Sequence, residues 1–266
     1  MEDFSRYNGE GTKLRQVQLR LLKILEQIDI ICRRHNIPYW IEYGTLLGAV
    51  RHKGFIPWDD DLDVCVMATD YPRLREYLLT ELPKQFALQD SGTDSYVWFD
   101  HGRIRDRHSH VDYPSFRLMK EQGIWIDLCI VDCVKSIKMK HIIDYLYRRA
   151  YREIHHYGDA LYSSAIKRII YKSIGYIIYP LCFGIKKLFS WWSNNSKSGF
   201  LGCYMLVVCA DWSAEEVFPL TELEFEGLKV FAPGKYKEQL TRIYGDYLQV
   251  PPENRRQIHC TDWEIW

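Results

Sequence analysis

The sequence lacks an excess of charge of either sign, because Lys plus Arg and Asp plus Glu number 35 each. A neutral chain has no bulk attraction to nucleic acid or to an anionic membrane, so a polyanion would have to meet a local basic patch. No Cys-x-x-Cys pair occurs among the eight cysteines, and several of them lie within apolar runs such as 62–67 and 126–131. These features predict reduced, buried thiols, no disulfide framework and no nucleic-acid partner.

Targeting and membrane-spanning segments are also lacking. Residues 1–6 contain no basic stretch followed by an apolar one, so we expect no secretory signal and a cytoplasmic location. The most apolar segment, Ile174 to Ile185, is interrupted by Gly175, Pro180 and Gly184 and is shorter than the roughly 20 residues that a spanning helix needs. This segment predicts a buried helix pair, with peripheral contact at the inner membrane face as the alternative.

The 266 residues instead show mixed helix and strand signals. Apolar residues recur every three or four positions from Lys13 to Asn36, which predicts a long amphipathic helix. A short aromatic strand at 39–43 then leads through a Gly44-Thr45 turn into a helix over 46–51, with Thr45 as its cap. Further strands are expected over 62–67, 97–107, 123–134 and 228–231, and further helices over 71–79 and from 233–234 to 244, before an extended Pro-rich end. The mixture predicts an α+β fold.

Composition divides the chain into three parts. Residues 136–200 are rich in Lys, Tyr and Ile with helical spacing and end in a polar run, whereas strand signals dominate on either side. We therefore predict a core with a metal site over 1–135, a helical subdomain over 136–200 and a C-terminal part over 201–266 that completes the core. The helical subdomain is expected to contact the acceptor or a membrane.

Four carboxylates, Asp59, Asp60, Asp61 and Asp63, occur within five residues at the start of an apolar strand. Side chains two residues apart on a strand share a face, so Asp61 and Asp63 point together. Two carboxylates this close repel each other unless a cation lies between them, and Mg²⁺, or Mn²⁺ in its place, suits carboxylates together with phosphate oxygens. A solvated acidic loop is the alternative. A calcium EF-hand loop is excluded because Val64 stands where that loop requires Gly.

The residues just upstream suggest a phosphate site. A strand that leads into a Gly-containing turn and a helix N-terminus presents backbone N–H groups and a partial positive charge. Gly44 permits close approach of the backbone and Thr45 adds a hydroxyl, while Arg51, His52 and Lys53 place cations near the same loop. We predict that these five residues bind the phosphates of a donor.

A third carboxylate is expected from a neighbouring strand. Asp127 lies in an otherwise apolar strand, where an unpaired charge is costly, so it is predicted to complete the metal shell or to accept a proton. Asp132, at the far end of that strand, has no assigned role, and the lone His259 is predicted to be structural. Three alternating arginines either line a phosphate channel or form a solvated face: Arg103, Arg105 and Arg107.

The combined motifs resemble the LicD family, which includes bacterial phosphorylcholine transferases and the fukutin-related proteins. The resemblance is carried by Gly44-Thr45-Leu46-Leu47-Gly48-Ala49-Val50-Arg51-His52 and by residues 54–63, and further blocks match at 125–128, 225–227 and 244–247. It implies a nucleotidyltransferase-like mixed sheet with flanking helices and a helical insertion. In that fold Asp61 and Asp63 would be the paired metal carboxylates and Asp127 the third acid.

The resemblance also implies a function. Family members move a phospho-alcohol, such as phosphocholine or ribitol phosphate, from a CDP-linked donor to a glycan hydroxyl. We therefore expect a metal-dependent phosphotransferase with a CDP-alcohol donor and a glycan or glycolipid acceptor. An Asp-x-Asp sugar-nucleotide glycosyltransferase, nucleotidyl transfer to a small acceptor and a non-catalytic binding fold are the alternatives. Four aromatic residues near the motifs form either a cage for a quaternary ammonium or ordinary core packing: Trp40, Tyr43, Trp58 and Trp125.

Overall fold

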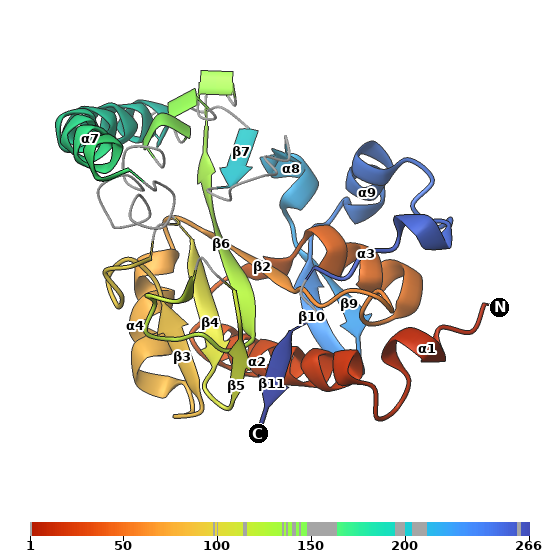
Figure 1. Ribbon diagram of the computed structural model, residues 1–266. Coiled ribbons are helices and arrows are strands. Elements are labelled where there is room, and N and C mark those ends of the chain that lie inside the picture. The colour runs from red at the N-terminus through yellow and green to blue at the C-terminus, as the bar shows by residue number, and fades with distance from the viewer. Residues whose placement is uncertain are drawn as a thin grey trace.

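A mixed β-sheet forms the centre of the protein in a computed structural model (Figure 1). The structure describes residues 2–266 except 98, 100, 114–115, 135, 137, 140–141, 144, 148–163, 195–199, 204–211 and 260–261. The strands follow the order β1 (Tyr39–Ile41), β2 (Asp63–Met67), β6 (Trp125–Cys133), β4 (Gly102–Asp106) and β3 (Phe86–Gln89). Strands β2 and β6 are parallel and the other pairs are antiparallel, which confirms the α+β class.

The long strand β6 carries a smaller extension of the sheet. Its last residues pair with β7 (Phe200–Cys203), which in turn pairs with β8 (Trp212–Ser213). The strand expected over 97–107 is shorter than predicted, because β4 begins only at Gly102. Val97 and Phe99 instead pack in a separate apolar cluster with Phe116 and Met119. These loop residues therefore cover the sheet beside β6, where the candidate site lies.

One face of the sheet is covered by helix α2 (Lys13–Arg34) and helix α4 (Tyr71–Glu81) (Figure 1). The side chain of Thr12 caps α2 by accepting from the backbone N of Arg15. The apolar stripe of α2 packs in one cluster with Val64 and Leu128. Because side chains alternate along a strand, Asp63 and Asp127 then face the opposite side.

Helix α3 (Tyr43–His52) begins earlier than the sequence predicted. Glu42, in extended conformation, is the N-cap, and its carboxylate accepts from the backbone N of Tyr43 at 3.3 Å. Gly44 and Thr45 therefore lie in the first turn of the helix, and the prediction of Thr45 as the cap is wrong. Its hydroxyl instead accepts from the backbone N of Asp63 at 2.9 Å, which ties α3 to β2.

The C-terminal residues form a hairpin of β9 (Thr221–Phe225) and β10 (Leu228–Ala232), followed by α9 (Tyr236–Tyr244). Glu226 and Gly227 join the strands with φ of 51° and 81°, a left-handed turn that suits glycine. The Glu226 carboxylate accepts from both terminal nitrogens of Arg15 and from the backbone N of Phe55. The hairpin thereby holds the loop that leads to the acidic cluster.

Short elements complete the fold: α1 (Ser5–Asn8), α8 (Ala214–Val217), the 3-10 turn η2 (Glu253–Arg255), and β5 (Ser109–Val111) paired with β11 (Trp263–Ile265). None of the five cysteines whose thiols are described is in a disulfide, and four of them are buried, with Cys133 the exception: Cys32, Cys65, Cys129, Cys133 and Cys182.

Helix α7 (Ala165–Asn194) lies at one edge of the molecule, beyond the end of β6 (Figure 1). It is one continuous helix that includes Pro180, so the predicted buried helix pair is wrong. Ile177 and Leu181 are 76% and 64% exposed, so the described part of the protein leaves this side of the helix uncovered. The first part of the predicted helical subdomain, 148–163, lies outside the described residues. Among the helices that are described, none combines the length and apolarity needed to cross a membrane.

Candidate active site

Three carboxylates that the sequence predicted to act together do meet in the structure. The register of the parallel pair sets Asp63 of β2 directly beside Asp127 of β6. The backbone N of Asp127 also donates to the carbonyl of Leu62 at 3.1 Å, so the two strands are fixed at this level. One oxygen from each of Asp61, Asp63 and Asp127 lies within 4.8 Å of the other two. This spacing matches a set of ligands around one cation.

Asp127 is held by three side-chain donors. Its Oδ1 lies 2.9 Å from Nε2 of His101 and accepts from Nε of Arg103 at 2.7 Å, and its Oδ2 accepts from Nε1 of Trp125 at 3.0 Å. Burial alone would raise the pKa of Asp127, but the charge of Arg103 and the hydrogen bonds of both partners hold that pKa well below its usual range. Asp127 therefore stays ionised and is a poor acceptor for a proton.

Arg103 reaches Asp127 because the two residues face each other across the β4–β6 pair. Its side chain is nine-tenths buried, and its guanidinium carbon lies 4.3 Å from the ring centre of Phe99 and 4.8 Å from that of Trp125. Within the described part of the chain, its buried Nη1 has no hydrogen-bond partner. Sequence reasoning missed this partner of Asp127, since pairing between separate strands leaves no local pattern.

The solvated face predicted as one alternative for the three arginines is wrong for Arg103 and Arg105, which are both buried. Arg105 donates to the side chain of Gln89 and to the carbonyl of Gly123, each at 2.8 Å. Only Arg107 is half-exposed, where it forms an ion pair with Glu121. The first two arginines therefore anchor β4 to its neighbours, and Arg103 alone contacts the acidic site.

A second group of ligating side chains adjoins the first. Asp59, Asp60 and His259 also bring one possible ligand atom each within 4.8 Å of the others. The backbone N of His259 donates to Asp60 at 2.9 Å, and its Nδ1 lies 3.3 Å from the same carboxylate. The hydrogen bond with Asp60 raises the pKa of His259 to about 9, with further contributions from the neighbouring carboxylates. The C-terminal segment thus adds positive charge beside the acidic loop, a contact that the sequence did not predict.

The negative charge of Asp61 is balanced by fewer hydrogen-bond donors and positive charges than that of Asp127. Its Oδ1 accepts from the backbone N of Leu62 at 2.9 Å. Burial raises the pKa of Asp61 to about 6, and the charge of Asp127 contributes to the same shift. Burial also raises the pKa of Asp59 to about 7, with the charge of Asp61 adding to it. The acidic loop is therefore under like-charge repulsion that a cation would relieve.

The predicted phosphate-binding residues separate into two groups along α3. Gly44 and Thr45 lie beside the carboxylates: a Cβ on Gly44 would come within 2.8 Å of Asp59, and Thr45 binds the backbone of Asp63. Glycine at 44 thus permits the close approach of the Asp59 carboxylate to the helix, at the place where the sequence predicts a phosphate.

Arg51, His52 and Lys53 lie at the other end of α3, about 9 Å further along its axis at 1.5 Å per residue. Arg51 donates to the carbonyls of Tyr247 and Gln249, both at 3.3 Å. These contacts hold the C-terminal segment against α3. The role of the three cations in binding a donor remains a prediction.

The four aromatic residues near the motifs have different surroundings. Trp40 is buried and donates to Glu42, Tyr43 packs against Trp212, and Trp58 belongs to another cluster with Phe4. Trp125, described above, binds Asp127. Trp40 and Tyr43 share one buried cluster, whereas Trp58 belongs to another, so the described contacts of the four rings are core packing and hydrogen bonds.

The last family-like block also reaches the site. Burial raises the pKa of Tyr244, at the end of α9, and the charges of Asp63, Glu42 and Asp59 raise it further. Tyr244 therefore lies within electrostatic range of the carboxylates. Asp132, by contrast, lies at the far end of β6, where its Oδ1 accepts from the backbone N of Cys133.

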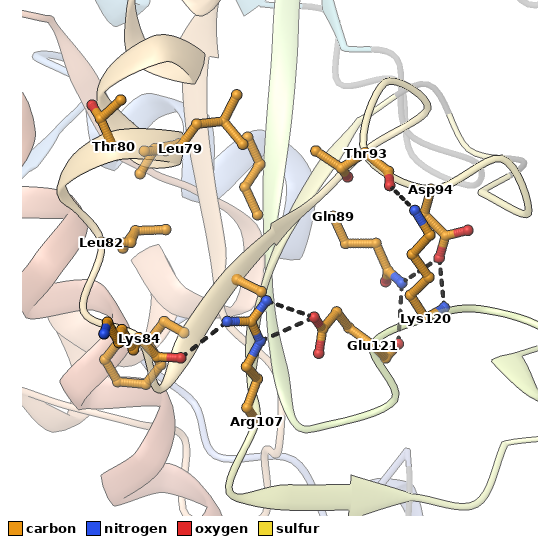
Figure 2. Close-up of a pocket in the computed structure, with 14 residues that line it drawn as sticks. Leu79, Thr80, Leu82, Lys84, Gln89, Thr93, Asp94, Arg107, Lys120 and Glu121 are labelled. Atoms are coloured by element: carbon orange, nitrogen blue, oxygen red, sulfur yellow. Dashed lines mark hydrogen bonds and ion pairs between the residues drawn. The ribbon is translucent and has the colours of Figure 1, made fainter.

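A cavity of about 520 Å³ lies at the β3 edge of the sheet, and Figure 2 shows its lining. Arg107 binds Glu121 and the carbonyl of Lys84 there, and Lys120 binds the carbonyl of Thr93. Its described lining comes from α4, β3 and the loops near Arg107 and Lys120. The cavity is thus separate from the carboxylates of β2 and β6.

The mixed sheet and the three adjoining carboxylates define an α+β protein with an acidic site between two parallel strands. Residues 36–155 match the LicD/FKTN/FKRP nucleotidyltransferase domain. The chain therefore carries a LicD-family domain, which confirms the resemblance seen in the motifs. Asp61, Asp63 and Asp127 all lie within the matched range.

Similar proteins extend this finding. The chain is 28% identical over 263 residues to the lipopolysaccharide cholinephosphotransferase LicD of Haemophilus influenzae. The alignment covers 92% of this chain and 95% of that protein. It is 31% identical over 99 residues to the human ribitol 5-phosphate transferase FKRP, covering 35% of this chain and 20% of FKRP. An uncharacterized protein of Rickettsia prowazekii is 43% identical over 77 residues, 29% of this chain and 27% of that protein.

Proposed function

We propose that this protein transfers a phospho-alcohol from a CDP-linked donor to a hydroxyl of a cell-surface glycan, with phosphocholine as the first candidate for the group transferred. The observation that carries the proposal is the meeting of Asp61, Asp63 and Asp127 within 4.8 Å inside the LicD-type domain. The named relatives support the reaction class, because one transfers phosphocholine and another ribitol 5-phosphate.

The donor set fits a hard divalent cation such as Mg²⁺. Three carboxylates converge, and burial, together with the charge of Asp127, raises the pKa of Asp61, so a cation at this place would be favoured. When bound, such an ion would neutralise the phosphates of the donor and orient them. Asp61, Asp63 and Asp127 are the residues that would hold it.

Asp127 fits the role of ligand and positioning group better than that of general base. Three donors already bind its carboxylate, and its pKa lies well below the usual range, so it would take up a proton only weakly. Arg103 and Trp125 fix its orientation from the same sheet face. The attacking hydroxyl would then lose its proton to another acceptor.

The transfer itself requires positioning more than covalent chemistry by the protein. The acceptor oxygen would form a bond to the phosphorus that carries the alcohol, while the bond from that phosphorus to the bridging oxygen breaks and CMP leaves. Thr45 contributes by fixing the backbone of Asp63, and Gly44 by admitting the carboxylate of Asp59. Both residues hold the acidic loop in the geometry that a bound donor would meet.

A thermal-shift series tests the binding half of the proposal. Ligands that bind only the folded state raise the unfolding temperature, so CDP-choline and CDP-ribitol are compared with CMP, each with Mg²⁺ and with EDTA. We expect one CDP-alcohol to stabilise the protein in Mg²⁺ and to do so much less in EDTA. Stabilisation by a nucleotide-sugar alone would favour a glycosyltransferase.

A double label tests the transfer half. With the cytidine and the alcohol of the donor labelled separately, the alcohol label is expected on the glycan and the cytidine label in free CMP. Cytidine on the acceptor would instead establish nucleotidyl transfer.

A further expectation concerns residues 136–200: replacing them with the corresponding segment of a relative should change the choice of acceptor and leave CDP-ligand binding intact. The opposite pattern would reject an acceptor role for this segment.

A further inference from the structure

Helix α7 has two unlike sides. The side that meets the protein is marked by Gly175, Cys182 and Phe189, which are buried and spaced seven residues apart. At 100° per residue, a second side about 120° around the helix from these residues carries exposed apolar residues at intervals of four and seven. They form a row that we call the outer row: Ile166, Ile170, Ile177, Leu181, Leu188 and Trp192.

The outer row is exposed along the whole helix. Its members range from 44% exposed at Trp192 to 76% at Ile177. Apolar residues that are exposed singly are normal, but a row that extends along a helix of 30 residues forms a continuous apolar surface. Such a surface indicates that something apolar covers it when the protein works.

The charge of the helix indicates what kind of partner covers the outer row. The sequence of α7 contains five basic residues and no Asp or Glu, in a chain whose total charge is zero. Two exposed basic residues, Lys167 and Lys187, lie on opposite flanks of the outer row, about 60° and 100° from its centre line on the helix. An apolar stripe with basic borders is the pattern of a helix that lies in the plane of a membrane surface.

We propose that α7 binds an anionic lipid surface, with the outer row toward the acyl chains and Lys167 and Lys187 at the phosphate level. Trp192 and Tyr176, both exposed, are amphipathic rings that suit the headgroup region. The inference rests on the proposed function in one respect, because a lipid-linked glycan acceptor would lie at such a surface. A second copy of the chain would also cover apolar residues, but it would give no reason for a helix with basic and no acidic side chains.

Flotation of the full chain with protein-free vesicles tests the proposal. We expect the wild-type chain to float with vesicles of phosphatidylcholine and phosphatidylglycerol at 7:3, about tenfold more strongly than with phosphatidylcholine alone. Ile177→Glu should weaken binding to the anionic vesicles by about tenfold or more, because it places a charge at the centre of the outer row. Leu79→Glu, at an exposed position of α4, is the matched control and should bind as the wild type does.

Two further variants separate charge from apolar contact. Lys167→Gln and Lys187→Gln should each weaken binding to the anionic vesicles about fivefold, the equivalent of about 1 kcal/mol per basic residue. Far-UV circular dichroism verifies that each variant keeps its helix content. Absence of flotation by the wild type, or unchanged flotation of Ile177→Glu, would overturn the proposal. A wild-type dimer in light scattering that Ile177→Glu abolishes, without vesicle binding, would assign the outer row to a second copy.

Failure of this proposal and failure of the proposed function are distinguishable. Vesicle binding requires neither donor, acceptor nor Mg²⁺, so its loss leaves the labelled-transfer experiment unaffected. Conversely, absence of phospho-alcohol transfer would leave the vesicle result standing.

Discussion

Replacement of Arg103 tests whether the buried network around Asp127 is built as described. The Nε of Arg103 lies 2.7 Å from Asp127, and the two side chains are 10% and 8% exposed. Removing one partner of such a pair leaves a buried charge without full compensation, which costs about 3–5 kcal/mol. For a chain of this size each kcal/mol lowers the unfolding temperature by about 2–4 °C. Arg103→Gln should therefore lower it by about 6 °C or more.

Arg107, just after the end of β4, provides a matched control. It pairs with Glu121 at 2.9 Å, but its side chain is 47% exposed, so the pair contributes at most about 1 kcal/mol. Arg107→Gln should accordingly shift the unfolding temperature by no more than about 4 °C. Arg103→Lys should fall between, because it keeps the charge and loses the planar guanidinium beside the aromatic rings.

The assay is thermal unfolding followed by circular dichroism at pH 7.5 in EDTA, so that no divalent cation compensates the buried charge of Asp127. Equal unfolding temperatures for Arg103→Gln and the wild type would refute the reasoning, and so would an equal loss in Arg107→Gln. Either result would mean that Asp127 does not depend on Arg103 for its charge balance.

Three other changes give expected outcomes. Asp63→Asn should abolish turnover and reduce stabilisation by Mg²⁺ while leaving the unfolding temperature in EDTA unchanged or higher, because it removes like-charge repulsion; near wild-type activity would reject the metal assignment. Gly48→Ala should lower the unfolding temperature, because the new Cβ would lie 2.4 Å from the carbonyl oxygen of Gly54. This clash outweighs the helix propensity of Ala, which favours Ala over Gly by about 1 kcal/mol. A rise in the unfolding temperature would contradict the packing. Although burial raises the pKa of Asp90, hydrogen bonds from Arg75 and Tyr71 lower it overall, so Asp90→Asn should destabilise by about 2 kcal/mol at pH 7. Because that contribution is present only above the usual carboxylate pKa of about 4, denaturant titrations should show the loss shrinking as the pH falls below 4, and a constant loss would reject the ion pair.

Local patterns in the sequence predicted the elements whose cause is local. The three- and four-residue spacing from Lys13 defined α2, because that spacing alone gives a helix a buried stripe. The start of helix α3 was predicted less well, since Glu42 and Thr45 can both cap a helix and only the contact of Thr45 with Asp63 decides between them.

By itself the sequence determined the acidic pair, since Asp61 and Asp63 are two residues apart at the start of a strand and must share a face. Its contiguous motifs also carried the resemblance to the LicD-type domain that residues 36–155 match. Only the tertiary structure decided which groups balance Asp127, because His101 and Arg103 reach it from β4 and the loop before it. The same holds for α7: its apolar sequence predicted burial, but burial requires a partner surface. Within the described residues the fold supplies one around Cys182 and Phe189 and leaves Ile177 in solvent.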